Sequence, residues 1–250
     1  GNHISNIVGV TAGLGYGIHH TAFPTFPYTQ GSLGCARIVN NYIRRTQRHA
    51  IYPGRGGCVV VEGNTIVEHR KVIESGSNGA QRVAISASRS EGASISHNIC
   101  LDCYDGFVSV DVDTILSASE VTRNMIIEGN IALYPHAFPP YTFGTAAPAT
   151  DGFPTDLIFS NNSAYQDENI ESSYGGALVQ VYSGKHIAFL GNRLTVLNAI
   201  AGRSLFYIPG FGETAGTANY TDSLYFLGNT LRGTGAIGDV YAFEFGTAAS

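Results

Sequence analysis

One eight-residue pattern recurs along this 250-residue chain and constrains its fold more than any other feature. It reads apolar, any, apolar, any, turn residue, Asn, any, apolar, and its copies begin at Ala36, Val59, Ala93, Met125, Leu157, Ile187 and Leu224. Each of these seven copies has three apolar slots, and all 21 are filled by apolar residues, although only 44% of the chain is hydrophobic. The asparagines are 23, 34, 32, 32, 30 and 37 residues apart, and Asn2 with Ile4 matches the tail of an eighth copy. Such a repeat predicts the stacked coils of a solenoid, with surplus residues leaving each coil as loops.

The chemistry of each slot supports a β-solenoid. Alternation of apolar and other residues over the first five positions predicts a strand with one buried face. Glycine, asparagine or histidine precedes each repeat asparagine, and these residues tolerate the positive φ of a sharp bend. We expect the asparagines to turn inward and to stack at ~4.8 Å between coils as a hydrogen-bonded ladder. Replacing one of them with alanine is expected to cost ~1–3 kcal/mol, because a buried partner is left unpaired.

A second family of short strands aligns more loosely. Its members are centred on Ile18, Ile51, Ile85, Val108, Val179 and Phe243, which we expect to point inward. The residues that follow them then form an outward ladder along which a long ligand would lie, and these are His19, Tyr52, Ser86, Ser109, Gln180 and Glu244.

The Asn-centred repeat, together with the stretch from Arg48 to Tyr52, resembles the right-handed parallel β-helix superfamily. That superfamily includes pectate-lyase-like enzymes, other polysaccharide lyases, epimerases and phage tailspike depolymerases. The resemblance covers nearly the whole chain and implies an all-β fold of about seven coils. It also implies glycan chemistry at an extracellular or virion surface and, by analogy with tailspikes, a homotrimer. No catalytic motif of any one member matches residue by residue.

Paired carboxylates provide the best local candidates for catalysis. In the run from Val108 to Asp113 the valines face the core, so Asp111 and Asp113 share the outer face with Cα atoms ~6.5–7 Å apart. Their carboxyl groups then fall within the ~5–9 Å range that glycosidases use, and mutual repulsion separates their pKa values. Asp102, just upstream, is expected to join them. The alternatives are an ordinary solvated strand face or a Ca²⁺ site; no other cofactor is expected.

Two histidines and their neighbours offer weaker candidates. His49 has the same parity as Ile51, which predicts an inward-pointing, satisfied core histidine. The run from Glu68 to Lys71 is the most charged in the chain, and it is either a solvated coil edge or a clamp for a sugar carboxylate.

Long insertions are expected to carry part of the function. The segments 21–33, 135–156 and 209–221 are rich in Gly, Pro, Thr, Phe and Tyr. Tyr134 and Tyr141 are expected to present flat rings to sugar faces. The rival interpretation is that these loops pack against a neighbouring subunit.

Composition limits the remaining choices. Only 13% of residues are charged and the formal net charge is −5, which argues against a nucleic-acid partner. No apolar run approaches the roughly 20 residues that span a bilayer, so no membrane partner is expected. The four cysteines lack metal-ligand spacing and are expected to be free thiols or to form one incidental disulfide. We expect a single β-helix domain over residues 1–250, cut from a longer chain.

Three functions remain open from the sequence. The first is a polysaccharide depolymerase, either a glycoside hydrolase or a lyase, with acidic residues on the outer strand face. The second is a non-catalytic glycan-binding or structural shaft of a tail fibre or adhesin. An epimerase is a third alternative. The paired aspartates and the uneven repeat spacing favour the enzyme.

Overall fold

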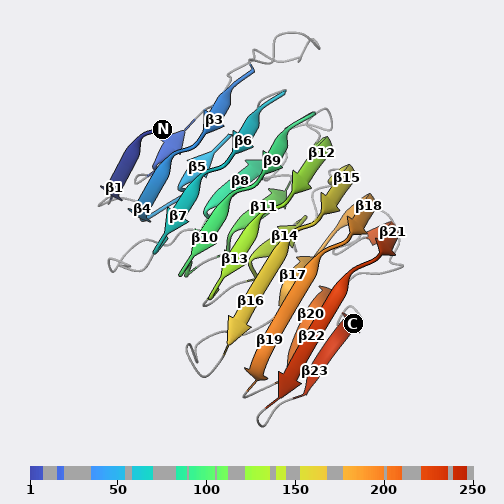
Figure 1. The fold of residues 1–250 in the computed structure, drawn as a ribbon. Helices are drawn as coiled ribbons and strands as arrows, with labels where there is room; N and C mark the ends of the chain where they lie inside the picture. Colours follow the sequence, from blue (N-terminus) through green and yellow to red (C-terminus); the bar gives the residue numbers. More distant parts are fainter. Residues whose placement is uncertain are drawn as a thin grey trace.

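The protein is a right-handed parallel β-helix, seen in a computed structural model of the chain (Figure 1). The structure describes residues 1–7, 16–19, 35–53, 58–69, 83–88, 90–104, 106–111, 122–135, 139–144, 153–167, 177–199, 202–209, 221–235 and 239–246. Strands within each of three sheets are parallel, and the chain visits sheet A, sheet B and sheet C in turn. Successive coils stack from β1 at one end to β23 at the other, so the two termini lie at opposite ends of the stack (Figure 1).

Each coil contributes one strand to each sheet. Sheet A consists of β1 (His3–Ile7), β4 (Tyr42–Thr46), β7 (Thr65–Val67), β10 (Ile99–Leu101), β13 (Ile131–Leu133), β16 (Ser163–Asp167), β19 (Arg193–Ala199) and β22 (Thr230–Gly235). Sheet B consists of β2 (Ile18–His19), β5 (Ile51–Tyr52), β8 (Ile85–Ser88), β11 (Val108–Asp111), β14 (Tyr141–Phe143), β17 (Ala177–Val181), β20 (Arg203–Ile208) and β23 (Val240–Phe245). Sheet C consists of β3 (Arg37–Val39), β6 (Val60–Glu62), β9 (Ser94–Ser96), β12 (Arg123–Glu128), β15 (Thr155–Ser160), β18 (Gly184–Leu190) and β21 (Thr221–Leu227).

The asparagine repeat forms the corner between sheets C and A. The residue before each repeat asparagine has a φ between 55° and 65°, as its Gly, Asn or His identity predicts. Each asparagine then points inward and donates its side-chain N–H to the Oδ1 of the next one, as Asn64 does to Asn98 at 2.9 Å. The same Nδ2 also donates to a strand carbonyl one coil behind, 2.9 Å away at Ile38. The ladder runs through Asn2, Asn41, Asn64, Asn98, Asn130, Asn162, Asn192 and Asn229, which confirms the predicted eighth copy.

The core changes character along the stack. Its first coils are filled mainly by buried isoleucine and valine, such as Ile43, Ile51 and Ile66. Its later coils carry a continuous run of edge-to-face and stacked rings, formed by Phe143, Phe159, Phe189, Phe206, Phe226 and Phe243. Such pairs add about 0.5–1.5 kcal/mol each beyond the burial of their area. The packing of the stack therefore rests on aromatic contacts toward its C-terminal end.

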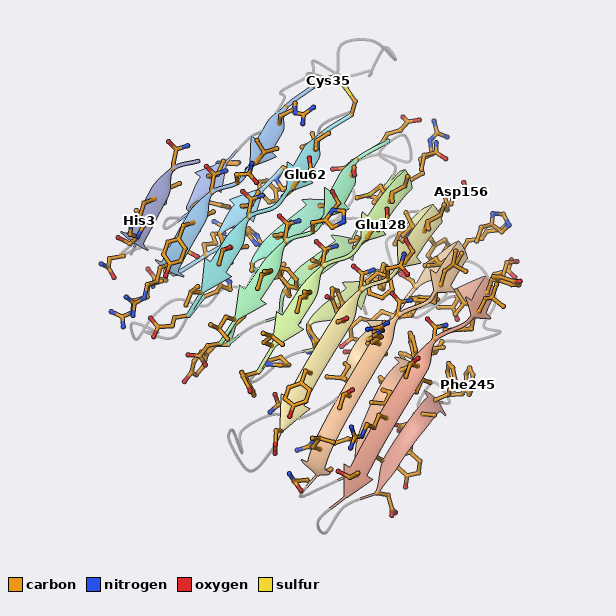
Figure 2. The ribbon with its side chains drawn as sticks, viewed as in Figure 1. His3, Cys35, Glu62, Glu128, Asp156 and Phe245 are labelled. Atoms are coloured by element: carbon orange, nitrogen blue, oxygen red, sulfur yellow. A yellow bond between two sulfur atoms is a disulfide. The ribbon has the colours of Figure 1, made fainter. Side chains whose placement is uncertain are left out.

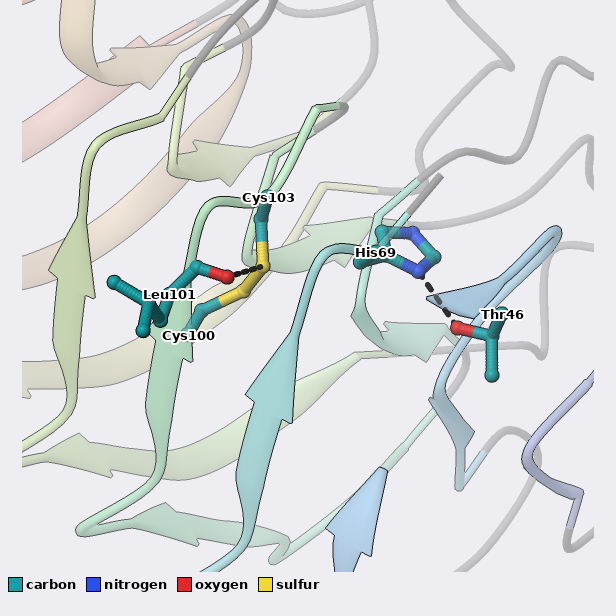
Figure 3. Close-up of a disulfide and its surroundings, with 5 residues drawn as sticks. All are labelled: Thr46, His69, Cys100, Leu101 and Cys103. Atoms are coloured by element: carbon teal, nitrogen blue, oxygen red, sulfur yellow. Dashed lines mark hydrogen bonds between the residues drawn. A yellow bond between two sulfur atoms is a disulfide. The ribbon is translucent and has the colours of Figure 1, made fainter. Parts of the chain in front are cut away.

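Both pairs of cysteines form disulfides, which corrects the expectation of free thiols or one incidental bridge. Cys35 is joined to Cys58 on the next coil, and Cys100 is joined to Cys103 within one coil. Figure 3 shows the second bridge, with the Cys103 Sγ 4.0 Å from the carbonyl oxygen of Leu101. The separation of Cys35 and Cys58 is 23 residues, which equals the spacing of Asn41 and Asn64. Equivalent positions on adjacent coils lie close enough for this bridge.

The insertion predicted over residues 135–156 is not a loop throughout. Tyr141–Phe143 forms β14, a full member of sheet B, and the end of the segment begins β15. Residues 21–33, by contrast, lie outside the described residues, as do 210–220 of the third predicted insertion.

The last coil leaves apolar side chains exposed at the end of the stack. Phe245, labelled in Figure 2, is 55% exposed, and Tyr225 and Leu227 on β21 are 58% and 59% exposed. Among the described strands, β21, β22 and β23 pair only with strands of the preceding coil, because each is the last strand of its sheet.

Candidate functional site

The outer face of sheet B carries the ladder predicted from the sequence, with two members added. Strand pairing aligns the inward column Ile18, Ile51, Ile85, Val108, Tyr141, Val179, Phe206 and Phe243. The outward column beside it is His19, Tyr52, Ser86, Ser109, Thr142, Gln180, Tyr207 and Glu244. Thr142 and Tyr207 are the additions. Seven intervals of ~4.8 Å give this column a length of about 34 Å.

Solvent reaches this column mainly at its two ends. His19 and Glu244 are exposed, and Tyr52, Thr142 and Tyr207 are half-buried. Ser86, Ser109 and Gln180 are buried, at 3%, 6% and 9% exposure. A ligand lying on this face therefore meets accessible groups first at the two ends and at Thr142.

An aromatic and cationic cluster occupies the N-terminal end of the face. We call it the N-terminal cluster; its members are Tyr16, His19, Arg48, His49 and Tyr52. The Tyr16 and His19 rings stack with centroids 4.6 Å apart, and the Tyr52 ring lies 5.1 Å from that of His19. The guanidinium carbon of Arg48 is 4.7 Å from the Tyr16 ring centroid, within cation–π range. The sequence therefore placed His19 and Tyr52 together correctly but missed Tyr16 and Arg48.

The side chain of His49 is the buried member of this cluster. Its ring stacks on Tyr52 at 5.2 Å, and its Nδ1 donates to the carbonyl oxygen of Val83 at 2.7 Å. The prediction of a buried histidine is confirmed, at 1% exposure. Ala50 and Ile51 both belong to the core, so strict alternation fails between residues 49 and 51.

A second group of polar and aromatic side chains lies at the C-terminal end of the same face. Gln180 hydrogen-bonds the Tyr182 hydroxyl, and burial raises the pKa of Tyr182, with a smaller contribution from the neighbouring Tyr207. Ser204 donates a hydrogen bond to the carboxylate of Glu244. We call Gln180, Tyr182, Ser204, Tyr207 and Glu244 the C-terminal cluster.

Tyr141, predicted to contact substrate, is instead a core residue. It is fully buried between Phe107 and Phe159, so its ring cannot stack on a sugar. Its hydroxyl lies 3.0 and 2.9 Å from the carbonyl oxygens of Asn130 and Ser163, to which it donates. Burial raises the pKa of Tyr141 well above its ordinary value. The inward column of sheet B needs a large residue here, and tyrosine fits because its polar tip finds main-chain acceptors.

The predicted carboxylate set is described only in part. Asp111 is the last residue of β11 and pairs in register with Ser88, but its side chain lies outside the described residues, as does all of Asp113. Asp102 follows β10 in sheet A and precedes β11. Asp102 precedes the first residue of β11, whereas Asp111 is at the far end of that strand, about 10 Å further along. The catalytic set therefore stays a prediction.

Asp102 and the predicted ligand residue Tyr134 instead lie on a corner at the end of the sheet A strands. Asp102 and Tyr134 have φ values of 59° and 53°, and Arg45 and Glu68 occupy the equivalent positions on earlier coils at 55° and 52°. Arg44 and Arg45 each donate from Nε to the Glu68 carboxylate at 2.7 Å. These hydrogen bonds, that of Arg44 foremost, lower the pKa of Glu68 from 4.5 to about 2. The charged run predicted at a coil edge is thus confirmed for Glu68 as an ion-paired corner.

Two kinds of feature are absent from the described part of the chain. Within it, no group of three or more His, Cys, Asp or Glu side chains is arranged to hold a metal ion. Likewise, the described ranges contain no helix that is long and apolar enough to cross a membrane.

Comparison with known proteins adds little to this geometry. No protein-family model matches the chain. No curated protein matches it either. Among solved structures, the chain is similar to the Streptococcus pneumoniae surface protein and adhesin PfbA, at 10% sequence identity and a TM-score of 0.37. That alignment covers 83% of this chain and 67% of the other.

Proposed function

We propose that this protein is a glycan-binding β-helix whose ligand lies along the outer face of sheet B. The observation that supports it is the column from His19 to Glu244, in which strand pairing aligns polar and aromatic side chains over eight successive coils. Tyrosine offers a flat apolar face to a sugar ring and a hydroxyl to its polar groups, and Tyr52 and Tyr207 supply one near each end. Hydroxyl and amide groups such as those of Thr142 and Gln180 suit uncharged sugar hydroxyls.

Binding to a panel of bacterial capsular, O-antigen and plant glycans tests this proposal. For a glycan that binds, Tyr52→Ala and Tyr207→Ala are each expected to raise Kd about tenfold, which corresponds to about 1.4 kcal/mol. Tyr225→Ala is the matched control, because Tyr225 is a 58% exposed tyrosine on sheet C. A glycan whose affinity falls equally in the control and in the two sheet B variants would place the ligand elsewhere.

A second candidate function, cleavage of the bound glycan, is favoured by the position of Asp111. Its backbone is in register with Ser88 and two residues beyond Ser109, so it belongs to the strand at the middle of the same face. In this hypothesis Asp111 and Asp113 act as acid and base or nucleophile, with Asp102 assisting. Asp111→Asn is then expected to abolish turnover while the free energy of unfolding changes by less than about 1 kcal/mol.

The assay for cleavage reads reducing ends and absorbance at 235 nm after incubation with the same panel. Product with new ultraviolet absorbance would identify a lyase, and product without it a hydrolase. If a glycan binds but is not cleaved, the protein only binds it. If Asp111→Asn keeps full activity, Asp111 is not part of the catalytic site.

An extracellular or virion-surface location is part of the proposal. Two disulfides among four cysteines are typical of oxidising compartments and uncommon in the cytosol. The homotrimer implied by the resemblance to tailspikes is likewise a proposal, and light scattering that gives a monomer mass would contradict it.

A further inference from the structure

An exposed asparagine at the corner between sheets C and A belongs to an acceptor triplet for N-linked glycans. Residues 161–163 read Asn-Asn-Ser, which fits the pattern Asn-X-Ser/Thr in which X is not proline. The other such triplet in the sequence is Asn219-Tyr220-Thr221, of which the described part of the chain includes Thr221 alone. Asn161 is therefore the acceptor whose surroundings the structure shows.

We propose that Asn161 is a site of N-linked glycosylation and that its oligosaccharide projects from this corner, away from the outer face of sheet B. This inference rests on the extracellular location that is part of the proposed function, since the transfer takes place in a secretory pathway. The two disulfides are a separate indication of an oxidising compartment of that kind.

The residues of the triplet point alternately outward and inward. Asn161 is exposed, with a φ of 55°, and its Nδ2 donates to the Glu128 Oε1 at 3.3 Å in a solvent-exposed contact. Asn162 is 0% exposed and belongs to the ladder, with its Nδ2 donating to the carbonyl oxygen of Ile127 at 2.8 Å. Ser163 begins β16 and is half-buried on the outer face of sheet A. Of the two adjacent asparagines, only Asn161 thus presents its amide to solvent.

The corner has room for a bulky group beside Asn161. The turn residues at the equivalent position on the preceding and following coils are Gly129 and Gly191, neither of which has a side chain. A Cβ placed on Gly191 would lie 2.8 Å from the Asn161 Oδ1, so the side chain of Asn161 leans over that glycine. On the other side, the ring of His97 leans over Gly129. The open direction is therefore along Gly191, and sheet B does not share this corner.

Transfer of the glycan is a substitution at a sugar carbon. The donor is an oligosaccharide joined through its anomeric carbon to a lipid diphosphate, and the transferase, not this chain, binds it. A bond forms between that carbon and the Asn161 Nδ2, and the bond from the carbon to the diphosphate oxygen breaks. The lipid diphosphate leaves, and Nδ2 gives up one of its two protons to a base of the transferase. The product amide keeps one N–H, which suffices for the hydrogen bond to Glu128.

Asn40 provides a matched position on the same corner. It is exposed, has a φ of 55° and precedes the ladder residue Asn41, as Asn161 precedes Asn162. Its triplet ends in Tyr42 and therefore lacks the hydroxyl that the acceptor pattern requires. Asn40 is thus expected to be unmodified in the wild type and to gain a glycan in Tyr42→Ser, at a side chain that is 38% exposed.

The test uses the full chain behind a secretory leader, translated into endoplasmic reticulum microsomes and also secreted from cultured eukaryotic cells. Asn219→Gln is the common background, which removes any glycan on the other triplet. The peptide that contains residue 161 is expected to carry a glycan, and its enzymatic release leaves an aspartate that mass spectrometry locates. Asn161→Gln and Ser163→Ala are expected to abolish the modification, whereas Ser163→Thr is expected to keep it.

Several results would overturn the proposal. An unmodified Asn161 in microsomes is one. A glycan present in microsomes but missing from the secreted, protease-resistant protein is another, because the folded corner would then exclude it. Absence of a glycan at Asn40 in Tyr42→Ser would contradict the argument that the corner leaves room.

These failures are distinct from failure of the proposed function, because glycan binding is measured separately on Asn161→Gln. If no glycan of the panel binds, the binding function is wrong and the modification of Asn161 stands. For a glycan that binds, the Kd values of the glycosylated protein and of Asn161→Gln are expected to agree. A difference between them would show that the attached glycan reaches the sheet B face, contrary to the proposed direction.

Discussion

Replacing Asn130 with alanine removes four hydrogen bonds from the centre of the ladder. The Asn130 Nδ2 donates to the carbonyl oxygen of Ile95 and to the Oδ1 of Asn162, both at 2.9 Å. Its Oδ1 accepts from the backbone N of Asn98 at 3.0 Å and from the Asn98 Nδ2 at 2.9 Å. Asn130 is 0% exposed, so water does not replace these partners.

The magnitude follows from the groups that lose a partner. The Asn98 backbone N–H, one N–H of its amide and the Ile95 carbonyl each lose a bond, while the Asn162 Oδ1 keeps the backbone N–H of residue 130 at 2.9 Å. A buried group left without its partner costs about 1–3 kcal/mol, and partial relaxation lowers the sum. We therefore expect Asn130→Ala to reduce the free energy of unfolding by about 3–5 kcal/mol, more than the ~1–3 kcal/mol expected from the sequence, because three groups and not one lose a partner.

Asn229→Ala provides the matched control at the end of the ladder. Asn229 is half-buried; its Nδ2 donates to the Phe189 carbonyl at 2.8 Å, and its Oδ1 accepts from the backbone N and the Nδ2 of Asn192 at 2.9 and 2.8 Å. Because Asn229 is partly exposed, water can replace these partners in the variant, and the loss of stability should be less than half of that in Asn130→Ala. Urea unfolding followed by circular dichroism gives the free energy of unfolding of each variant. The two values are comparable if the variants have the same m value, the slope of that free energy against urea concentration. Equal losses for the two variants would refute the argument that burial of the ladder sets its contribution.

Three further predictions concern ionisation and the disulfides. Because the pKa of Glu68 is lowered to about 2 by its hydrogen bond to Arg44, the wild type is expected to lose stability relative to Glu68→Gln as pH falls from about 4.5 to about 2; parallel acid unfolding curves would contradict this. Burial raises the pKa of Tyr141 above 10.0, so the wild type should lose stability relative to Tyr141→Phe as pH rises beyond 10, and phenolate absorbance from Tyr141 should appear only on unfolding. Cys35 and Cys58 are exposed, whereas Cys100 and Cys103 are buried. A mild reductant should therefore release two thiols quickly and the other two only when the protein unfolds. Simultaneous release of all four thiols would contradict this prediction.

The repeat made the fold predictable because each of its positions has a separate physical requirement. Gly63 and Asn64 illustrate this, since one supplies the positive φ and the next supplies the inward amide. The second strand family was aligned correctly from Ile18 to Phe243 because its inward positions are apolar and its outward positions polar.

Other features could not be predicted from the alternation of apolar and polar residues along the strands. The strand containing Tyr141 was hidden because a buried tyrosine with a hydrogen-bonded hydroxyl looks, in sequence, like a surface ring in a Pro- and Thr-rich loop. Tyr207 was missed because tyrosine satisfies either side of a strand. Tyr16 and Arg48 lie outside the repeated pattern, and only the three-dimensional stacking brings them to His19.

The sequence does contain a signal for the disulfide between neighbouring coils. Cys35 and Cys58 are separated by one full coil, since Asn41 and Asn64 have the same spacing. The pairing within one coil, between Cys100 and Cys103, spans a corner at which Asp102 has a positive φ, and the sequence pattern does not predict that corner.

The most direct test of the central claim is a crystal structure of the protein with a bound oligosaccharide identified from the glycan panel. We predict density for the sugar chain along the outer face of sheet B, in contact with Tyr52 at one end and Tyr207 at the other. Density confined to the outer face of sheet A or sheet C, with the sheet B column unoccupied, would contradict it.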